Sequence, residues 1–270
     1  MMTTAITPGL GNTLAAEWTK LRSVRSTWVI VIAAFVVSVG FSVLFSFVTE
    51  QAYPSLPAEQ RSSFDPAGTS MVGMNLGLIT IAVLGALATS AEYSTGMIRL
   101  TLSVTPSRGR VLAAKAIVAG LLGFVLGTVF AALAFLIGQA ILGIGPAVPT
   151  LAIGRPEVLR SLLGWGVEMA AFSLLALSFA VMMRSAAGAI ATTIGLIFVP
   201  AILGAFLPVW AQRHVLAYFP AAAAEQLSTA RLEPDSATYL GPVTGAGTLV
   251  TWVAVAMVVA FSLKGKRDSG

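Results

Sequence analysis

The sequence predicts an all-α polytopic membrane protein with six transmembrane helices, and three observations lead to this class. The chain is 57% hydrophobic and only 10% charged, with a mean hydropathy of +0.89. A soluble globular domain carries about 25% charged residues, so this chain has too few to cover a water-facing surface. Apolar runs long enough to cross a bilayer recur along it, and positive charges gather at alternate connections between them. Residues 1–270 are therefore predicted to form a single transmembrane domain.

The first predicted element is an amphipathic helix over residues 12–25 that lies along the membrane interface. Asn12 or Thr13 can cap its start. Leu14, Trp18 and Leu21 share one face through their i, i+4, i+7 spacing, so that Trp18 would lie at headgroup depth. An ordinary juxtamembrane anchor that only sets orientation is the alternative.

The charges of this helix suit the cytoplasmic interface. Glu17 is expected in the first turn, where the helix dipole favours an acid. The polar and aromatic residues assigned to the interfacial helix are Glu17, Trp18, Lys20, Arg22 and Arg25.

Six apolar segments follow in order. The predicted spans cover residues 28–48, 71–91, 111–142, 162–183, 186–207 and 243–263. At ~1.5 Å per residue, a run of about 20 residues covers the ~30 Å hydrocarbon core. The third run exceeds this length, so it tilts or extends beyond the membrane. Arg184 and Ser185 make a tight turn between the fourth and fifth spans, and Pro200 is expected to interrupt the fifth.

The connections on the outer side are polar or irregular. Residues 49–70 form an acidic loop, and glycine and proline punctuate residues 143–156. Residues 208–242 alternate apolar patches with charges, which predicts short re-entrant helices that dip into the outer leaflet while buried in protein.

The distribution of lysine and arginine predicts that both termini are cytoplasmic. Eleven basic residues fall on the proposed inner side: Lys20, Arg22, Arg25, Arg99, Arg108, Arg110, Lys115, Arg184, Lys264, Lys266 and Arg267. Five fall on the outer side: Arg61, Arg155, Arg160, Arg213 and Arg231. The opposite topology would invert the positive-inside rule.

Several functions are disfavoured by what the sequence lacks. It has no cysteine and one histidine, which excludes disulfides and multi-histidine metal sites. It has no phosphate-binding Gly-Lys-Ser/Thr motif, no zinc-hydrolase motif and no Gly-x-Ser-x-Gly motif. We therefore expect neither an enzyme nor a nucleic-acid-binding protein, and no metal or cofactor on this chain.

The connection between the second and third spans is the candidate contact with a soluble partner. It is short and basic, and it is predicted to be cytoplasmic. Gly96 lets the helix end or bend and Pro106 forces a second break, which leaves a short helix around Arg99 between two hinges. Glu92 and Arg108 flank this segment. A plain basic loop is the alternative.

Two stretches resemble the permease subunits of type-2 ABC exporters, especially those of actinobacteria. The first is Glu-Trp-Thr-Lys-Leu-Arg-Ser-Val-Arg-Ser-Thr-Trp at residues 17–28, and the second comprises Glu92, Gly96, Arg99, Leu102, Pro106, Arg108 and Lys115. The resemblance implies an interfacial N-terminal helix, a cytoplasmic coupling helix between spans 2 and 3, and re-entrant helices before the last span.

The same resemblance implies partners. A separate ABC ATPase subunit would bind ATP and contact Glu92, Gly96, Arg99, Pro106 and Arg108. A second permease copy, identical or different, would complete the translocation path in the bacterial cytoplasmic membrane, surrounded by lipid.

Glu168 is the one acid within the predicted spans, near the middle of the fourth. A lone acid at this depth costs on the order of 2.5–3.5 kcal/mol by insertion scales, so it must face the bundle or a wet cavity. It is a candidate for the translocation path, or a structural carboxyl bonded to serine or threonine on a neighbouring helix. An ATPase-independent transporter or channel would need Glu168 as its coupling residue, and a structural membrane protein is the third class.

Glycines four residues apart predict close helix packing within one subunit, with a contact between two subunits as the alternative. These pairs are Gly73 with Gly77, and Gly123 with Gly127.

Overall fold

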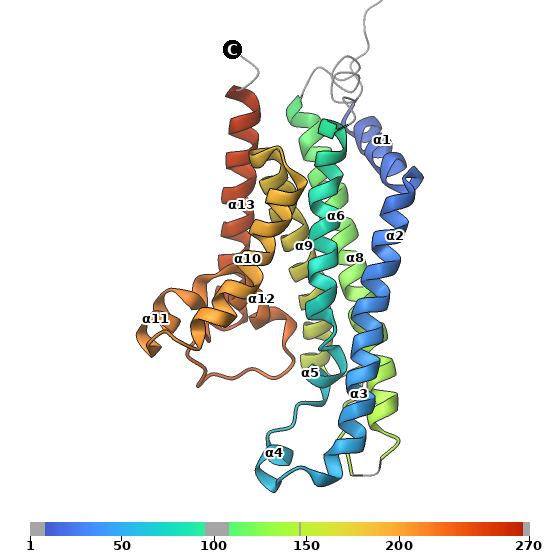
Figure 1. Cartoon of the computed structure of the whole chain (residues 1–270), viewed down its shortest axis with the longest axis vertical. Helices are drawn as coiled ribbons and strands as arrows, with labels where there is room; N and C mark the ends of the chain where they lie inside the picture. Colours follow the sequence, from blue (N-terminus) through green and yellow to red (C-terminus); the bar gives the residue numbers. More distant parts are fainter. Residues whose placement is uncertain (1–8, 95–107, 146, 267–270) are drawn as a thin grey trace, which may run out of the picture.

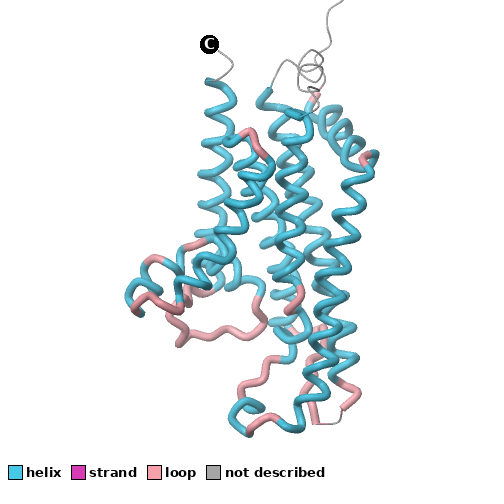
Figure 2. The backbone as a smooth tube through the Cα atoms, viewed as in Figure 1, coloured by secondary structure: helices cyan, strands magenta, loops and turns pink. Residues whose placement is uncertain are grey.

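The computed structural model of the chain describes residues 9–94, 108–145 and 147–266, and this part is helical throughout, without strands. Six of its helical segments are long and apolar enough to cross a membrane, as the sequence predicts. They stand side by side in one elongated bundle (Figures 1 and 2).

The N-terminal half of the chain contributes a short leading helix and three spans. α1 (Leu10–Ser23) precedes a first span built from α2 (Arg25–Phe35), the π-helical turn η1 (Val36–Gly40) and α3 (Phe41–Ala52). The connection after the first span holds η2 (Tyr53–Ser55) and α4 (Ala58–Ser62). α5 (Pro66–Met71) and α6 (Met74–Ser94) form the second span, and α8 (Arg108–Leu142) the third.

The C-terminal half contributes three more spans and a group of short helices. α9 (Pro156–Met183) and α10 (Ala186–Gly204) are the fourth and fifth spans. α11 (Val209–His214), η3 (Leu216–Tyr218) and α12 (Pro220–Ser228) follow, and α13 (Pro242–Lys266) is the last span. Figure 1 shows α11 and α12 beside the end of α10, away from the end where α13 terminates.

α9 is the central helix of the bundle. It packs against α6, α8, α10, α12 and α13. In its most apolar window 67% of the residues are buried, against 17% for α10 and for α13, which identifies the latter two as peripheral helices. The apolar residues that α10 and α13 expose suit contact with lipid.

Close approach of α8 to α9 depends on glycine, as predicted. A Cβ atom added at Gly123 would lie 3.0 Å from the Ala170 Cα, and one at Gly127 would lie 2.7 Å from the Trp165 carbonyl oxygen. Both distances leave no room for a side chain, so this small-residue face is used for packing inside one chain.

Gly73 and Gly77 face the π-helical turn in the same manner. An added Cβ at either position would overlap Ser38. The Gly73 amide, which lies at the break between α5 and α6, donates to the Ser42 hydroxyl at 3.0 Å. A hydroxyl from the first span thus satisfies a backbone donor that the break would otherwise leave open.

Three details of the N-terminal prediction were wrong. The leading helix begins at Leu10, after Gly9, rather than at Asn12 or Thr13, so Glu17 lies in its middle and not in its first turn. It ends at Ser23, because Val24 is extended (φ −87°, ψ 121°), and Arg25 is the first residue of α2. The Trp28 indole N–H donates to the Arg22 carbonyl at 2.9 Å and closes this corner.

The fifth span also differs from its prediction. Pro200 lies inside α10 without ending it, although its ring nitrogen cannot donate to the Leu196 carbonyl. The tight turn before this helix is as predicted, with Arg184 in the left-handed region (φ 53°) and the Ser185 hydroxyl accepting from the Gly188 amide at 3.1 Å.

Candidate functional site

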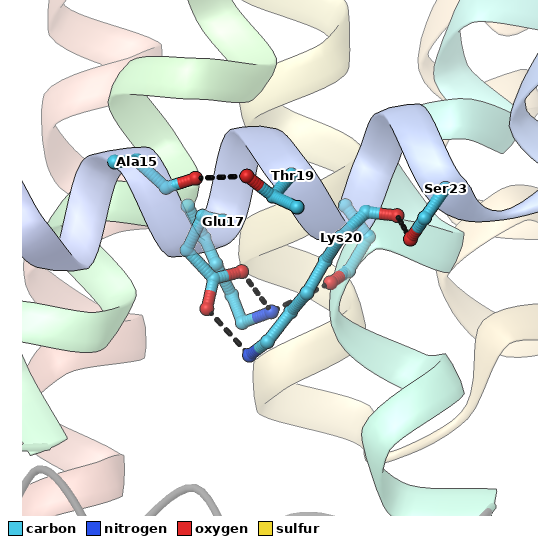
Figure 3. Close-up of polar contacts among 7 residues, drawn as sticks. Ala15, Glu17, Thr19, Lys20 and Ser23 are labelled. Atoms are coloured by element: carbon cyan, nitrogen blue, oxygen red, sulfur yellow. Dashed lines mark hydrogen bonds and ion pairs between the residues drawn. The ribbon is translucent and has the colours of Figure 1, made fainter.

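The end of the bundle at which α6 stops and α8 starts is held together by a buried ion pair. Glu17 on α1 and Lys115 on α8 meet at 2.8 Å, with 6% and 4% of their side chains exposed. Lys115 also donates to the Ala88 carbonyl of α6 at 3.1 Å. Lys20, one turn further along α1, donates to the other Glu17 oxygen at 2.8 Å (Figure 3). The Glu17–Lys115 pair therefore links α1, α6 and α8.

This arrangement reverses the usual orientation of a surface helix. The polar residues Thr13 and Glu17 of α1 are buried against the bundle, while Trp18 is 49% exposed. A helix that shows tryptophan outward and acid inward is suited to an apolar or interfacial surrounding. The position of Trp18 in the membrane interface stays a prediction.

Two of the residues predicted to contact the partner lie in the helices that this ion pair joins. Glu92 falls in the last turn of α6 and Arg108 is the first residue of α8. Gly96, Arg99 and Pro106 lie outside the described residues. Two residues that the sequence assigned to the interfacial helix lie outside this contact: Arg22 is exposed on α1, and Arg25 is exposed at the start of α2.

Lys115 was interpreted from the sequence as one more charge of a basic segment, and its buried role was missed. The sequence did contain one signal of this role. Glu17 is the only acid among the first 49 residues, so any basic residue near the start of the chain that needs an acidic partner there has only Glu17. Its partner is 98 residues away in the chain, and no local pattern could identify which basic residue it meets.

Glu168 lines a cavity of about 430 Å³. Around the axis of α9 it lies on the side opposite Gly166, which packs against α8. α6, α9, α10 and α12 all contribute to its walls. Glu168 is buried, and its Oε2 atom has no hydrogen-bond partner among the described residues. The indole nitrogen of Trp165, also on the wall, is likewise unpartnered there. The sequence thus located Glu168 correctly as a bundle-facing acid.

α12 is fixed to α9 at its C-terminal end. The Arg160 guanidinium donates to the carbonyls of Gln226 (2.9 Å) and Thr229 (2.7 Å), and the Ser161 hydroxyl donates to the Ser228 carbonyl. These donors satisfy carbonyls that have no partner at a helix end and place a cation at the negative end of the dipole. Arg160, counted from sequence only as an outer-loop charge, is therefore a structural residue.

A second, smaller cavity of about 160 Å³ adjoins the first through shared residues Glu225, Thr229 and Thr238. Enclosure by protein and, next, the negative charge of Glu233 raise the pKa of Glu225. Within the described residues, no three metal-ligating side chains converge.

These features define a helical, multi-pass membrane protein with a polar cavity beside its central helix. A model of the family described as ABC-2 family transporter protein matches residues 13–204, from within α1 to the end of α10. The match covers more than two thirds of the chain, so the protein belongs to this family and is a membrane permease of the ABC transporter class. A search of curated proteins gave no match.

Proposed function

We propose that this chain is the membrane-spanning subunit of an ATP-driven exporter, coupled to a separate ABC ATPase through residues 92–108. Two such subunits form the translocation path in the bacterial cytoplasmic membrane, with both termini and this connection in the cytoplasm. The ATPase binds and hydrolyses ATP, and this chain carries no catalytic group for that step.

The observation that carries the proposal is the buried contact of Glu17 with Lys115. Lys115 lies seven residues after the start of α8 and bonds the α6 carbonyl of Ala88, six residues before the end of α6. A force applied to the connection between these helices therefore acts on α1, α6 and α8 together. Closure of the ATPases would displace this unit, repack the permease dimer and open the path outward.

Co-purification tests the coupling. The tagged protein, isolated in mild detergent from its native host, is expected to carry a stoichiometric ATPase. Arg99→Glu is expected to lower both the amount of co-purified ATPase and the rate of ATP hydrolysis on the order of tenfold or more. This is the size of effect expected when a charged contact in an interface is lost. Arg213→Glu is the matched control, because Arg213 is an exposed arginine of α11, in the predicted outer connection.

Two results would contradict the proposal. A preparation without any ATPase that still transports would favour an ATPase-independent transporter that uses Glu168. An ATPase that stays bound and fully active in Arg99→Glu would exclude the 92–108 connection as the contact.

A further inference from the structure

The cavity beside α9 is built to hold a ligand. Its volume of about 430 Å³ falls in the range of pockets that enclose small organic molecules. Its walls come from α5, α6, α9, α10, η3 and α12 and from the segment after α12, so one chain forms this partly open cavity without a second copy. α12, which forms one wall, is fixed in place by Arg160 and Ser161.

Two buried polar atoms on the walls need partners. Glu168 is 4% exposed and Trp165 is 6% exposed, yet the Glu168 Oε2 and the Trp165 Nε1 have no hydrogen-bond partner among the described residues. A buried polar group without a partner is costly. A ligand that donates a hydrogen bond to the carboxylate would remove the larger part of that cost, because charge-assisted bonds are the strong ones.

The charge of the walls selects the sign of the ligand. The inner cavity is lined by two carboxyl groups, Glu168 and Glu225, and by no lysine or arginine, and a bound cation would favour the ionised form of both acids. The adjoining cavity adds Asp65 and Glu233 with a single arginine, Arg231. The Arg231 guanidinium donates to the Ser63 carbonyl at 2.7 Å. The Asp65 carboxylate accepts from the Ala67 amide at 3.0 Å, and three acids against one arginine therefore line this approach.

The rest of the inner wall is apolar. Met71, Leu78, Ile197 and Leu216 line it together with the Trp165 indole. Apolar walls around one charged group are suited to a ligand with a hydrophobic body and one cationic head. An aromatic ring beside the carboxylate adds an attractive face for a cation.

We propose that this cavity binds amphiphilic organic amines, with the protonated nitrogen on the Glu168 carboxylate and the hydrophobic body against the apolar wall. Glu225 and Glu233 attract the cation as it passes through the smaller, adjoining cavity. Amphiphilic amines would be the substrate class of the proposed exporter, and this assignment as substrates rests on the proposed function. Binding itself requires no ATPase, so it is tested separately.

The experiment uses the full chain in lipid nanodiscs without ATPase or ATP, with 4-phenylbutylamine as the probe and isothermal titration as the readout. Empty nanodiscs are subtracted to remove partition into lipid. Saturable binding is expected, and 4-phenylbutanol, the same body with a neutral head, is expected to bind at least about tenfold more weakly, the size of a lost charged hydrogen bond.

Three variants separate the site from the fold. Glu168→Gln is expected to lower amine affinity on the order of tenfold or more while leaving the weak alcohol binding unchanged. Ala201→Trp, at an exposed α10 position that also borders the cavity, narrows the space without touching Glu168 and should weaken both ligands. Glu157→Gln, an exposed acid in the first turn of α9, should change neither.

The outcomes decide the proposal in either direction. Equal affinity for amine and alcohol, or full amine affinity in Glu168→Gln, would overturn it. Amine binding that meets all three expectations, together with failure to recover an ATPase, would keep the amine site and reject the coupling proposal.

Discussion

At the scale of single residues, the Glu17–Lys115 contact is a buried charge pair on which the stability of the bundle is expected to depend. Both side chains are almost completely buried, in contrast to the exposed pair of Arg155 with Glu157. Breaking a buried pair by removing one partner leaves an uncompensated charge, whereas an exposed pair contributes little. Lys20 also contacts Glu17 but is 35% exposed, so we expect it to compensate only in part.

Lys115→Met is expected to destabilise the protein by about 3–5 kcal/mol, because Glu17 would remain buried without its main partner. The double variant Glu17→Gln/Lys115→Met is expected to recover most of the loss, since neither of the two buried charges is left and Lys20, which also contacts Glu17, is partly exposed. Thermal unfolding in detergent measures both.

The control for this pair is Arg22→Met, which removes an exposed cation from the same helix. It should leave the unfolding temperature nearly unchanged. A loss in Arg22→Met as large as in Lys115→Met would show that general charge, and not the buried contact, supports α1.

At the scale of elements, the contact of α12 with α9 shows why a short helix can be stable here. α12 has only nine residues, too few to be stable alone in water. Gly164 of α9 lets the backbone of α12 approach so closely that a Cβ atom there would overlap the Leu227 carbonyl. Arg160 and Ser161 then bind the carbonyls at its end.

Gly164→Ala is therefore expected to destabilise the packing of α12 by about 1–3 kcal/mol, the usual cost of overfilling a tight contact. Gly195→Ala is the matched control, because Gly195 of α10 has open space where the methyl group would lie. Thermal unfolding of both variants checks this, and an equal response at the two glycines would contradict the close contact of α9 with α12.

The elements themselves were largely predictable from sequence, because spans are defined by length and composition. All six predicted spans coincide with helices that are long and apolar enough to cross a membrane. The ends were less predictable: α9 starts at Pro156 rather than near Leu162, since proline at the first helical position is favourable and the added turn is amphipathic. The role of Arg160 depended on a partner segment 66–70 residues away, which no local pattern reveals.

At the scale of the whole molecule, the described ends of α1, α6, α8 and α13 that were assigned to the cytoplasm lie at one end of the bundle (Figure 1). α4 lies at the other end. The positive-inside rule predicts which end of the bundle is cytoplasmic. Because six spans alternate in direction, the helix ends assigned to the cytoplasm are expected to lie together at that end. The cavity beside α9, in contrast, is lined by residues from several segments that lie far apart in the chain, and it had no signature in the sequence except the isolated Glu168.

The absence of cysteine allows this orientation to be tested with single introduced thiols. Ala58→Cys on α4 is expected to react with a membrane-impermeant maleimide on intact cells, because Ala58 is exposed in the predicted outer loop. Gly11→Cys on α1 should react only after permeabilisation. Labelling in the reverse order would invert the proposed topology and place the 92–108 connection outside the cell.

The π-helical turn in the first span has a consequence for how that span meets its neighbours. Ala34, Ser38, Ser42 and Ser46 are all completely buried and lie four residues apart. In an α-helix with 3.6 residues per turn, every fourth residue drifts around the axis by about 40°. The wider turn at Val36–Gly40 falls short of a full rotation over four residues and offsets this drift. The first span thereby presents one straight row of small side chains, and Gly73 and Gly77 of the second span pack directly against it in a fixed register.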